Sequence, residues 1–173
     1  DVIKDILTYS ETCNPSYDYL LDLDVSAPMR TIKDLKKGFN IINSNPNAKN
    51  LFSVSEATKN PYFNMVEQNK DGFYSLSKPS KIVLSRQLAP KVFEMNASFY
   101  FFKRDFFYQK EVYLFNNALI YKMEHESFDL DHIIDFDSYE RSNRSRIWFQ
   151  GLYLCGYRGR AGGTAGRGWR IFM

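Results

Sequence analysis

Cysteine and glycine are scarce over most of this sequence. Its two cysteines, Cys13 and Cys155, have neither a CxxC partner nor a histidine at zinc-site spacing. We therefore expect neither a disulfide framework nor a zinc site. Residues 1–140 contain only two glycines, so this part of the chain lacks a glycine-rich loop of the kind that cradles phosphate groups.

Long apolar runs are also missing. None approaches the length of a membrane-spanning helix, and the chain begins at Asp1 without a charged and apolar leader. We expect a cytoplasmic protein with no membrane partner. The 173 residues, 44% hydrophobic and 17% aromatic, suffice for one well-packed globular domain.

Acidic residues are absent from residues 141–173, which carry seven arginines, no lysine and seven of the nine glycines. Residues 1–140 hold all 20 acidic residues against 16 basic ones. The net charge of +3 therefore hides two chemically different segments, and the basic balance does not by itself indicate a nucleic-acid-binding fold. We expect a domain over 1–140 and a separate Arg/Gly-rich tail over 141–173.

The most informative stretch among the residues present is Tyr19 to Arg30. Its nearly continuous apolar run predicts a central parallel strand that is covered on both faces. Asp22 and Asp24 are two residues apart, so both point to one face, where buried carboxylates need hydrogen bonds or a nearby cation. Pro28 has no N–H group and is expected to end the strand.

Helix and strand signals alternate along the rest of residues 1–140. Thr31 with Asp34 forms a predicted capping box, the start of a helix over 31–43. A short helix over 1–8 is predicted to precede the first strand, with a polar connection over 10–16. Further strands are predicted at 51–55, 95–102, 119–123 and 132–137, with a helical turn at 104–108 and a long irregular excursion at 56–91 that contains a hairpin. This alternation favours a three-layer α/β fold with a mainly parallel sheet.

Asp135 and Asp137 are the clearest chemical signal in the sequence. Residues i and i+2 of a strand present both carboxylates to one side, where they can hold Mg²⁺ next to substrate phosphates. The alternative to a metal site is that Asp135 and Asp137 are two solvated acids in a loop. His125 and His132 have no metal-site spacing and are interpreted as structural.

Polar side chains elsewhere could bind a ligand. Arg86 can recognise a carboxylate or phosphate through its planar guanidinium, or can be an ordinary surface arginine. Asn96, Ser98 and Tyr100 share one strand face and can form a wall for a hydroxyl-rich ligand; a half-exposed strand would have the same pattern.

Five blocks of the sequence, in this order, resemble the acylneuraminate cytidylyltransferases, the CMP-sialic acid synthetases. The likeness runs from about residue 1 to 140 and is closest to bacterial members that act on sialic, legionaminic or related acids. The blocks are Asp24-Val-Ser-Ala-Pro-Met-Arg30, Ser53-Val-Ser-Glu-Ala57 with Asn60-Pro-Tyr62, Arg86-Gln87, Asn96-Ala-Ser-Phe-Tyr100 and Ile134-Asp-Phe-Asp137.

The resemblance implies a nucleotide-diphospho-sugar-transferase-like (Rossmann-like) fold, incomplete at its N-terminus. It implies a homodimeric enzyme that makes a CMP-sugar and pyrophosphate from CTP and a nine-carbon 2-keto sugar acid, with Mg²⁺. Asp135 and Asp137 match the family's metal-binding pair and would be the catalytic residues. The substrate-binding positions match Asp24, Arg86, Gln87, Asn96 and Tyr100.

Asp24 stands where the family typically has Gln, and Ala97 stands where it has Gly. The family's first strand and its basic, glycine-containing CTP-binding loop are missing, so we expect this chain alone to be inactive. The tail over 141–173 is not expected to be part of the family fold. One interpretation of the tail is a frame-shifted or vector-derived extension. The alternative function for the chain is a non-enzymatic interaction module, in which the tail would bind RNA.

Overall fold

The computed structural model describes residues 2–13, 17–79, 86–108, 115, 117–125, 152–161 and 164–172. These residues divide into two compact units, and each is described by itself. Unit 1 comprises Asp1–Val54 and Met95–Met173, and unit 2 comprises Ser55–Glu94. The strand expected at 132–137 lies outside the described residues. No described helix is long and apolar enough to cross a membrane.

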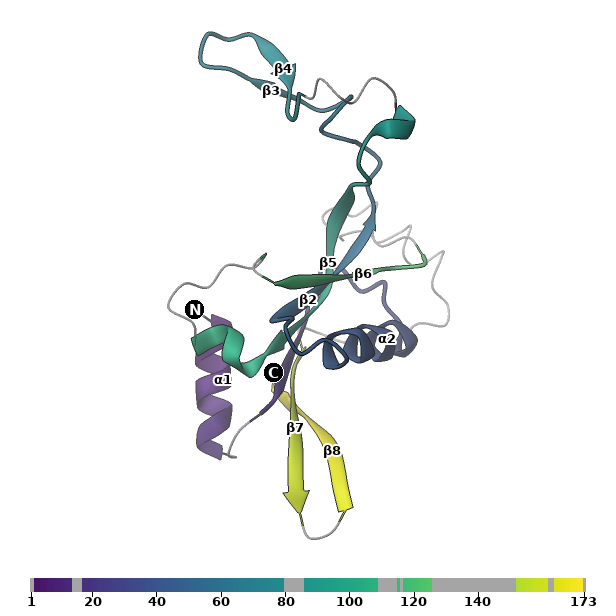
Figure 1. The fold of residues 1–173 in the computed structure, drawn as a ribbon. Coiled ribbons are helices and arrows are strands. Elements are labelled where there is room, and N and C mark those ends of the chain that lie inside the picture. Colours follow the sequence, from purple (N-terminus) through teal and green to yellow (C-terminus); the bar gives the residue numbers. More distant parts are fainter. Residues whose placement is uncertain are drawn as a thin grey trace. The chain divides into compact units, whose positions relative to one another are not determined.

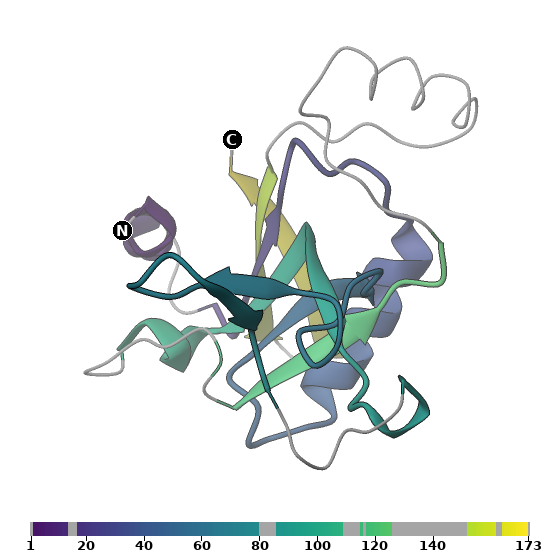
Figure 2. The same ribbon diagram turned by 90° about the horizontal axis from the view of Figure 1, so that it is seen from above.

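Two helices of unit 1 lie on opposite sides of its central strands (Figures 1 and 2). Helix α1 (Val2–Cys13) is longer than predicted, because residues expected in a polar connection extend it. The hydroxyls of Ser10 and Thr12 donate to the carbonyls of Leu7 and Tyr9, at 2.7 and 2.6 Å, so these polar side chains are satisfied within the helix.

Helix α2 (Ile32–Asn43) begins at the predicted capping box. The Thr31 hydroxyl accepts from the Asp34 N–H at 3.2 Å, and the Asp34 carboxylate accepts from the Thr31 N–H at 2.8 Å. Gly38 lets the helix approach the sheet closely, since a Cβ atom there would lie 2.9 Å from the Phe99 ring. The sequence prediction is therefore confirmed for this helix and its start.

The described strands of unit 1 form a sheet in the order β6-β2-β5-β1-β7-β8. Their bounds are β1 (Tyr19–Leu23), β2 (Asn50–Glu56), β5 (Phe93–Lys103), β6 (Ala118–Lys122), β7 (Leu152–Ala161) and β8 (Thr164–Phe172). Strands β2 and β6 are parallel, whereas β1 is antiparallel to both β5 and β7. The expectation of a mainly parallel sheet with β1 as a parallel strand is thus wrong: the sheet is mixed. A continuous apolar run predicts burial on both faces but does not specify the direction of the neighbouring strands.

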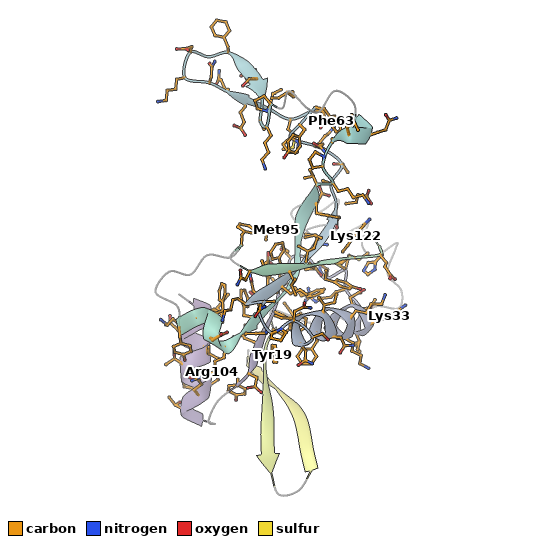
Figure 3. The ribbon with its side chains drawn as sticks, in the orientation of Figure 1. Tyr19, Lys33, Phe63, Met95, Arg104 and Lys122 are labelled. Atoms are coloured by element: carbon orange, nitrogen blue, oxygen red, sulfur yellow. The ribbon has the colours of Figure 1, made fainter. Side chains whose placement is uncertain are left out.

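Alternate residues of β1 and β5 pack against different helices. Leu21, Leu23, Phe99 and Phe101 belong to a core that includes Ile42 of α2. Leu20 and Phe102 belong to a second core, with Leu7 of α1 and the 3-10 helix η2 (Arg104–Tyr108). Figure 3 shows Arg104 beside α1, where it is paired with Glu11. The sheet is therefore covered on both faces, as the apolar run predicted.

Strands β7 and β8 come from the Arg/Gly-rich tail. They pair with each other, and β7 also pairs with β1, from Tyr19 with Gly156 to Leu23 with Leu152. The tail's composition does not predict strands, since glycine is depleted in them. The boundary near residue 140 between the family fold and the tail stays a prediction.

Unit 2 contains the hairpin of β3 (Val66–Gln68) and β4 (Tyr74–Leu76), within the irregular excursion where one hairpin was predicted. Asn69 organises its loop: its side-chain oxygen accepts from the N–H groups of Asp71 and Phe73, at 3.1 and 2.9 Å. Gly72 has a φ of +87°, a conformation that favours glycine. The 3-10 helix η1 (Arg86–Leu88) belongs to the same unit.

Candidate functional site

The loop over residues 24–30 follows β1 and closes on itself. One carboxylate oxygen of Asp24 accepts from both the N–H and the hydroxyl of Ser26, each at 2.9 Å. The Arg30 N–H donates to the carbonyl of Pro28 at 2.8 Å. Asp24 is partly buried. The two hydrogen bonds from Ser26 orient its carboxylate within the loop.

Arg30 lies at the centre of this loop and is only 5% exposed. Its Nη1 atom lies 2.8 Å from three backbone carbonyl oxygens, those of Asp24, Ala27 and Ser98. The first two belong to the loop and the third to β5. Because buried carbonyls need donors and a guanidinium donates in fixed directions, one side chain connects the end of β1, the loop and β5.

Strand β5 carries Asn96, Ser98 and Tyr100, but the prediction that they form one wall on a shared face is not confirmed: Asn96 contacts Met123 of the core beside α2, whereas Tyr100 packs against the core beside α1. Asn96 and Ser98 are 7% and 0% exposed, and Tyr100 is partly buried. The Asn96 side chain donates to the sulfur of Met123 at 3.1 Å and accepts from the Ser98 N–H at 3.3 Å. The Ser98 hydroxyl donates to the Ala27 carbonyl at 3.2 Å. A half-exposed strand, the alternative interpretation, is therefore wrong for Asn96 and Ser98.

Ala97 has a φ of +52°, in the left-handed region that favours glycine. It interrupts the regular alternation of β5 between Asn96 and Ser98. The family pattern has glycine at this position, and the backbone conformation supplies the physical reason. An L-residue with a Cβ atom pays a conformational cost there.

Asp22 lies opposite Tyr100 in the pairing of β1 with β5. Burial, and to a lesser extent the charge of Asp24, raise the pKa of Asp22 to about 6, although the charge of Arg30 acts in the opposite direction. Arg30 is a nearby cation, one of the two means, beside hydrogen bonds, by which the sequence analysis expected buried carboxylates to be stabilised. Asp22 titrates above the usual range of a carboxyl group while Arg30 limits the shift.

A second group of polar side chains joins the loop to α2 and β6. Asp34 accepts from the Tyr121 hydroxyl at 2.9 Å and lies 3.8 Å from His125, which contacts the Met29 carbonyl at 3.1 Å. Burial alone raises the pKa of Asp34, but hydrogen bonds from Thr31 and Tyr121 outweigh it and lower that pKa. Burial, together with the bond to Asp34, raises the pKa of Tyr121. His125 thus has the structural surroundings that the sequence predicted.

The structure brings together some of the predicted site residues. Asp24, Asn96 and Tyr100 lie in unit 1, on the loop and on the strand that Arg30 connects. Gln87 is exposed in η1 of unit 2, where Arg86 is described through its backbone. Their placement relative to Asp24 stays a prediction.

Asp135 and Asp137 lie outside the described residues, so the predicted magnesium pair stays a prediction. Within the described ranges, no group of three or more His, Cys, Asp or Glu side chains could hold a metal ion. The proposed ion would need only two carboxylates together with water and substrate phosphates, so its assignment depends on Asp135 and Asp137.

Sequence reasoning missed Arg30, as well as the contacts of Asp34 with Tyr121 and His125. Arg30 is one of three arginines in residues 1–140 and follows a strand end, which is a weak signal. Asp34 and Tyr121 are 87 positions apart, so only a tertiary structure reveals the hydrogen bond between them.

Comparison with known proteins places the chain next to two Campylobacter proteins. It is 41% identical over 137 residues to "Post-translational flagellin modification protein B" of Campylobacter coli. It is 39% identical over 140 residues to "CMP-N,N'-diacetyllegionaminic acid synthase" of Campylobacter jejuni subsp. jejuni. Each match covers 78% of this chain and 57% of the relative.

A scan against protein-family models gives no match. The chain spans little more than half the length of the two curated relatives. Identity near 40% over more than three quarters of the chain nevertheless makes it their homologue, which confirms the likeness to the acylneuraminate cytidylyltransferases that its sequence motifs predict.

Proposed function

We propose that this chain is part of a nucleotidyltransferase that transfers CMP from CTP to a nine-carbon 2-keto sugar acid of the sialic or legionaminic type. The observation that carries the proposal is the 39% identity to a CMP-N,N'-diacetyllegionaminic acid synthase. A synthase among the relatives favours an enzyme over a non-enzymatic RNA-binding module.

In this reaction the anomeric hydroxyl oxygen of the sugar acid attacks the α-phosphorus of CTP. The bond from that phosphorus to the oxygen bridging to the β-phosphorus breaks, pyrophosphate leaves, and the hydroxyl proton is released. Mg²⁺ held by Asp135 and Asp137 would neutralise triphosphate oxygens. Catalysis would depend chiefly on positioning the two substrates and stabilising negative charge in the transition state. It would not require a nucleophilic side chain of the protein.

The family motifs imply a sugar-acid subsite at Asp24, Asn96 and Tyr100, and the contacts that orient Asp24 and Asn96 support the part of it that these two residues would form. The Asp24 carboxylate is held by Ser26, and Asn96 is held next to Ser98, so both are oriented by their own backbone. Asp24 accepts hydrogen bonds and repels anions, so it would face hydroxyl or amide N–H groups of the sugar. Arg86, with Gln87 beside it, would bind the substrate's carboxylate or a phosphate.

The test is pyrophosphate release with CTP, Mg²⁺ and N,N'-diacetyllegionaminic or N-acetylneuraminic acid. Because the chain spans 57% of its relatives, the assay uses the 173-residue chain and a protein of the relatives' full length that carries it. We expect release from the full-length protein and little from the chain alone. Absence of release from the full-length protein with every sugar acid tested would contradict the proposal.

Asp137→Asn in the full-length protein should lower the rate by roughly two orders of magnitude or more, since it removes one negative charge from the proposed metal pair. Asp71→Asn, an exposed change in the hairpin of unit 2, is the matched control and should leave the rate unchanged. Full activity of a folded Asp137→Asn protein would show that the acid does not hold a required metal.

A further inference from the structure

We propose that Arg30 is a positioning residue that locks the loop over 24–30 to β5 and so fixes the separation of Asp24 and Asn96. The ligand part of this inference rests on the proposed function. The lock itself rests on the described contacts of Arg30.

The geometry of the guanidinium carries the argument. Nη1 has two hydrogens and three carbonyl oxygens at 2.8 Å, so at least one hydrogen is shared. The carbonyls of Asp24 and Ser98 belong to segments 74 positions apart in the sequence. Nη1 is a donor common to both, at a place where the side chain is 5% exposed and competition from water is small.

Each end of the lock lies next to a predicted substrate contact. On the loop, Arg30 binds the backbone carbonyl of Asp24 itself. On β5, it binds the carbonyl of Ser98, whose N–H donates to the Asn96 side chain at 3.3 Å. The Ser98 hydroxyl adds a second link to the loop, at the Ala27 carbonyl. Movement of the loop away from β5 would therefore break contacts on both sides at once.

A neutral side chain in place of Arg30 would leave buried carbonyls without this donor. Arg30→Met keeps much of the length but cannot donate, whereas Arg30→Lys keeps the charge and three N–H donors. Arg104→Met is the matched control, because Arg104 lies in the same unit, has a 43% exposed side chain and pairs with Glu11 instead.

The first test is amide hydrogen exchange, which needs no ligand. In Arg30→Met we expect amide exchange at Ser26, position 30 and Ser98 to become about tenfold faster or more, with α2 unchanged, because a local contact is lost. Arg30→Lys should restore part of the protection, and Arg104→Met should leave these amides unchanged. Unchanged exchange in a folded Arg30→Met protein would overturn the lock. If Arg30→Met does not fold, the same comparison is made between Arg30→Lys and wild type, with partial loss of protection expected and no loss overturning the lock.

The second test is steady-state kinetics in the full-length protein. Arg30→Met should raise the KM for the sugar acid about tenfold and change the KM for CTP less than about twofold, with partial rescue by lysine. A fall in activity that follows only the folded fraction, with both KM values unchanged, would show a structural role and overturn the positioning role. If wild type turns over no sugar acid, the proposed function fails, while hydrogen exchange still decides the lock.

Discussion

Unit 1 and unit 2 are built in different ways. All the buried hydrophobic side chains among the described residues belong to unit 1, in cores on both faces of its sheet. In unit 2, none of the described side chains is buried, and Phe73 and Tyr74 are 72% and 68% exposed. The hairpin of unit 2 is held by turn hydrogen bonds and strand pairing, and a two-stranded hairpin of this kind is marginally stable. We infer that stability depends on unit 1 and that unit 2 opens more easily.

The largest expected difference between the units concerns two phenylalanines. Phe99 is fully buried in unit 1, so Phe99→Ala should lower the free energy of unfolding by about 3–5 kcal/mol. Phe73→Ala should change it by less than about 0.5 kcal/mol, because its ring is already in water. Chemical denaturation of both variants measures this. Similar losses would contradict the assignment of stability to unit 1.

Asp34 provides the second comparison. Asp34→Ala removes the carboxylate that accepts from Thr31 and Tyr121, and should cost about 2–3 kcal/mol. Since the folded pKa of Asp34 is lowered, its contribution is full above the unfolded value of 3.8 and is lost as the pH falls through the lower folded pKa. The loss in free energy of unfolding caused by Asp34→Ala should therefore become smaller in strong acid. Thermal unfolding at several pH values measures it. Glu67→Ala in the hairpin is the control and should cost little, because Glu67 is exposed.

Asp22 should show the opposite dependence on pH. Its pKa is raised from 3.8 to about 6, so the folded state binds the proton more tightly than the unfolded state. The charged form therefore destabilises the fold fully above pH 6, and this effect disappears below about pH 4. Asp22→Asn should raise the free energy of unfolding at pH 7 by about 1–2 kcal/mol, after allowance for partial solvent screening. A gain of the same size at pH 7 and at pH 3.5 would show that charge is not the cause.

The smallest expected effect concerns two residues with positive φ. Ala97→Gly should stabilise unit 1 by up to about 1 kcal/mol, because glycine adopts a φ of +52° without steric cost. Gly72→Ala, at a φ of +87° in unit 2, should increase hydrogen exchange in the hairpin while global unfolding stays unchanged. Global destabilisation by Gly72→Ala would show that the hairpin is coupled to the core.

Local signals in the sequence predicted α2, β1, β5 and β6 of unit 1, but not β7 and β8 of the Arg/Gly-rich tail. The capping box at Thr31 and Asp34 fixed the start of α2, and apolar runs located β1, β5 and β6. Strand direction was not predictable, because a doubly covered antiparallel strand has the same apolar run as a parallel one.

The candidate site was predictable only in part. The motifs indicated Asp24, Asn96 and Tyr100 as substrate-binding residues, a role that stays a prediction, and the structure places them on segments that Arg30 connects. The role of Arg30 was hidden, because its partners are backbone carbonyls that no sequence pattern marks. The contacts of Asp34 with Tyr121 and His125 join residues 87 or more positions apart, which periodicity does not reveal.

The most direct test of the central claim is an amide NMR titration of the full-length protein with N,N'-diacetyllegionaminic acid in the absence of CTP. The account predicts saturable shifts at Asp24, Ser26, Asn96 and Tyr100 of unit 1, with no shifts over the Val66–Leu76 hairpin. Arg30→Met should weaken these shifts, and Arg104→Met should not. Shifts confined to the hairpin, or saturation without change at Asp24 and Asn96, would contradict the account.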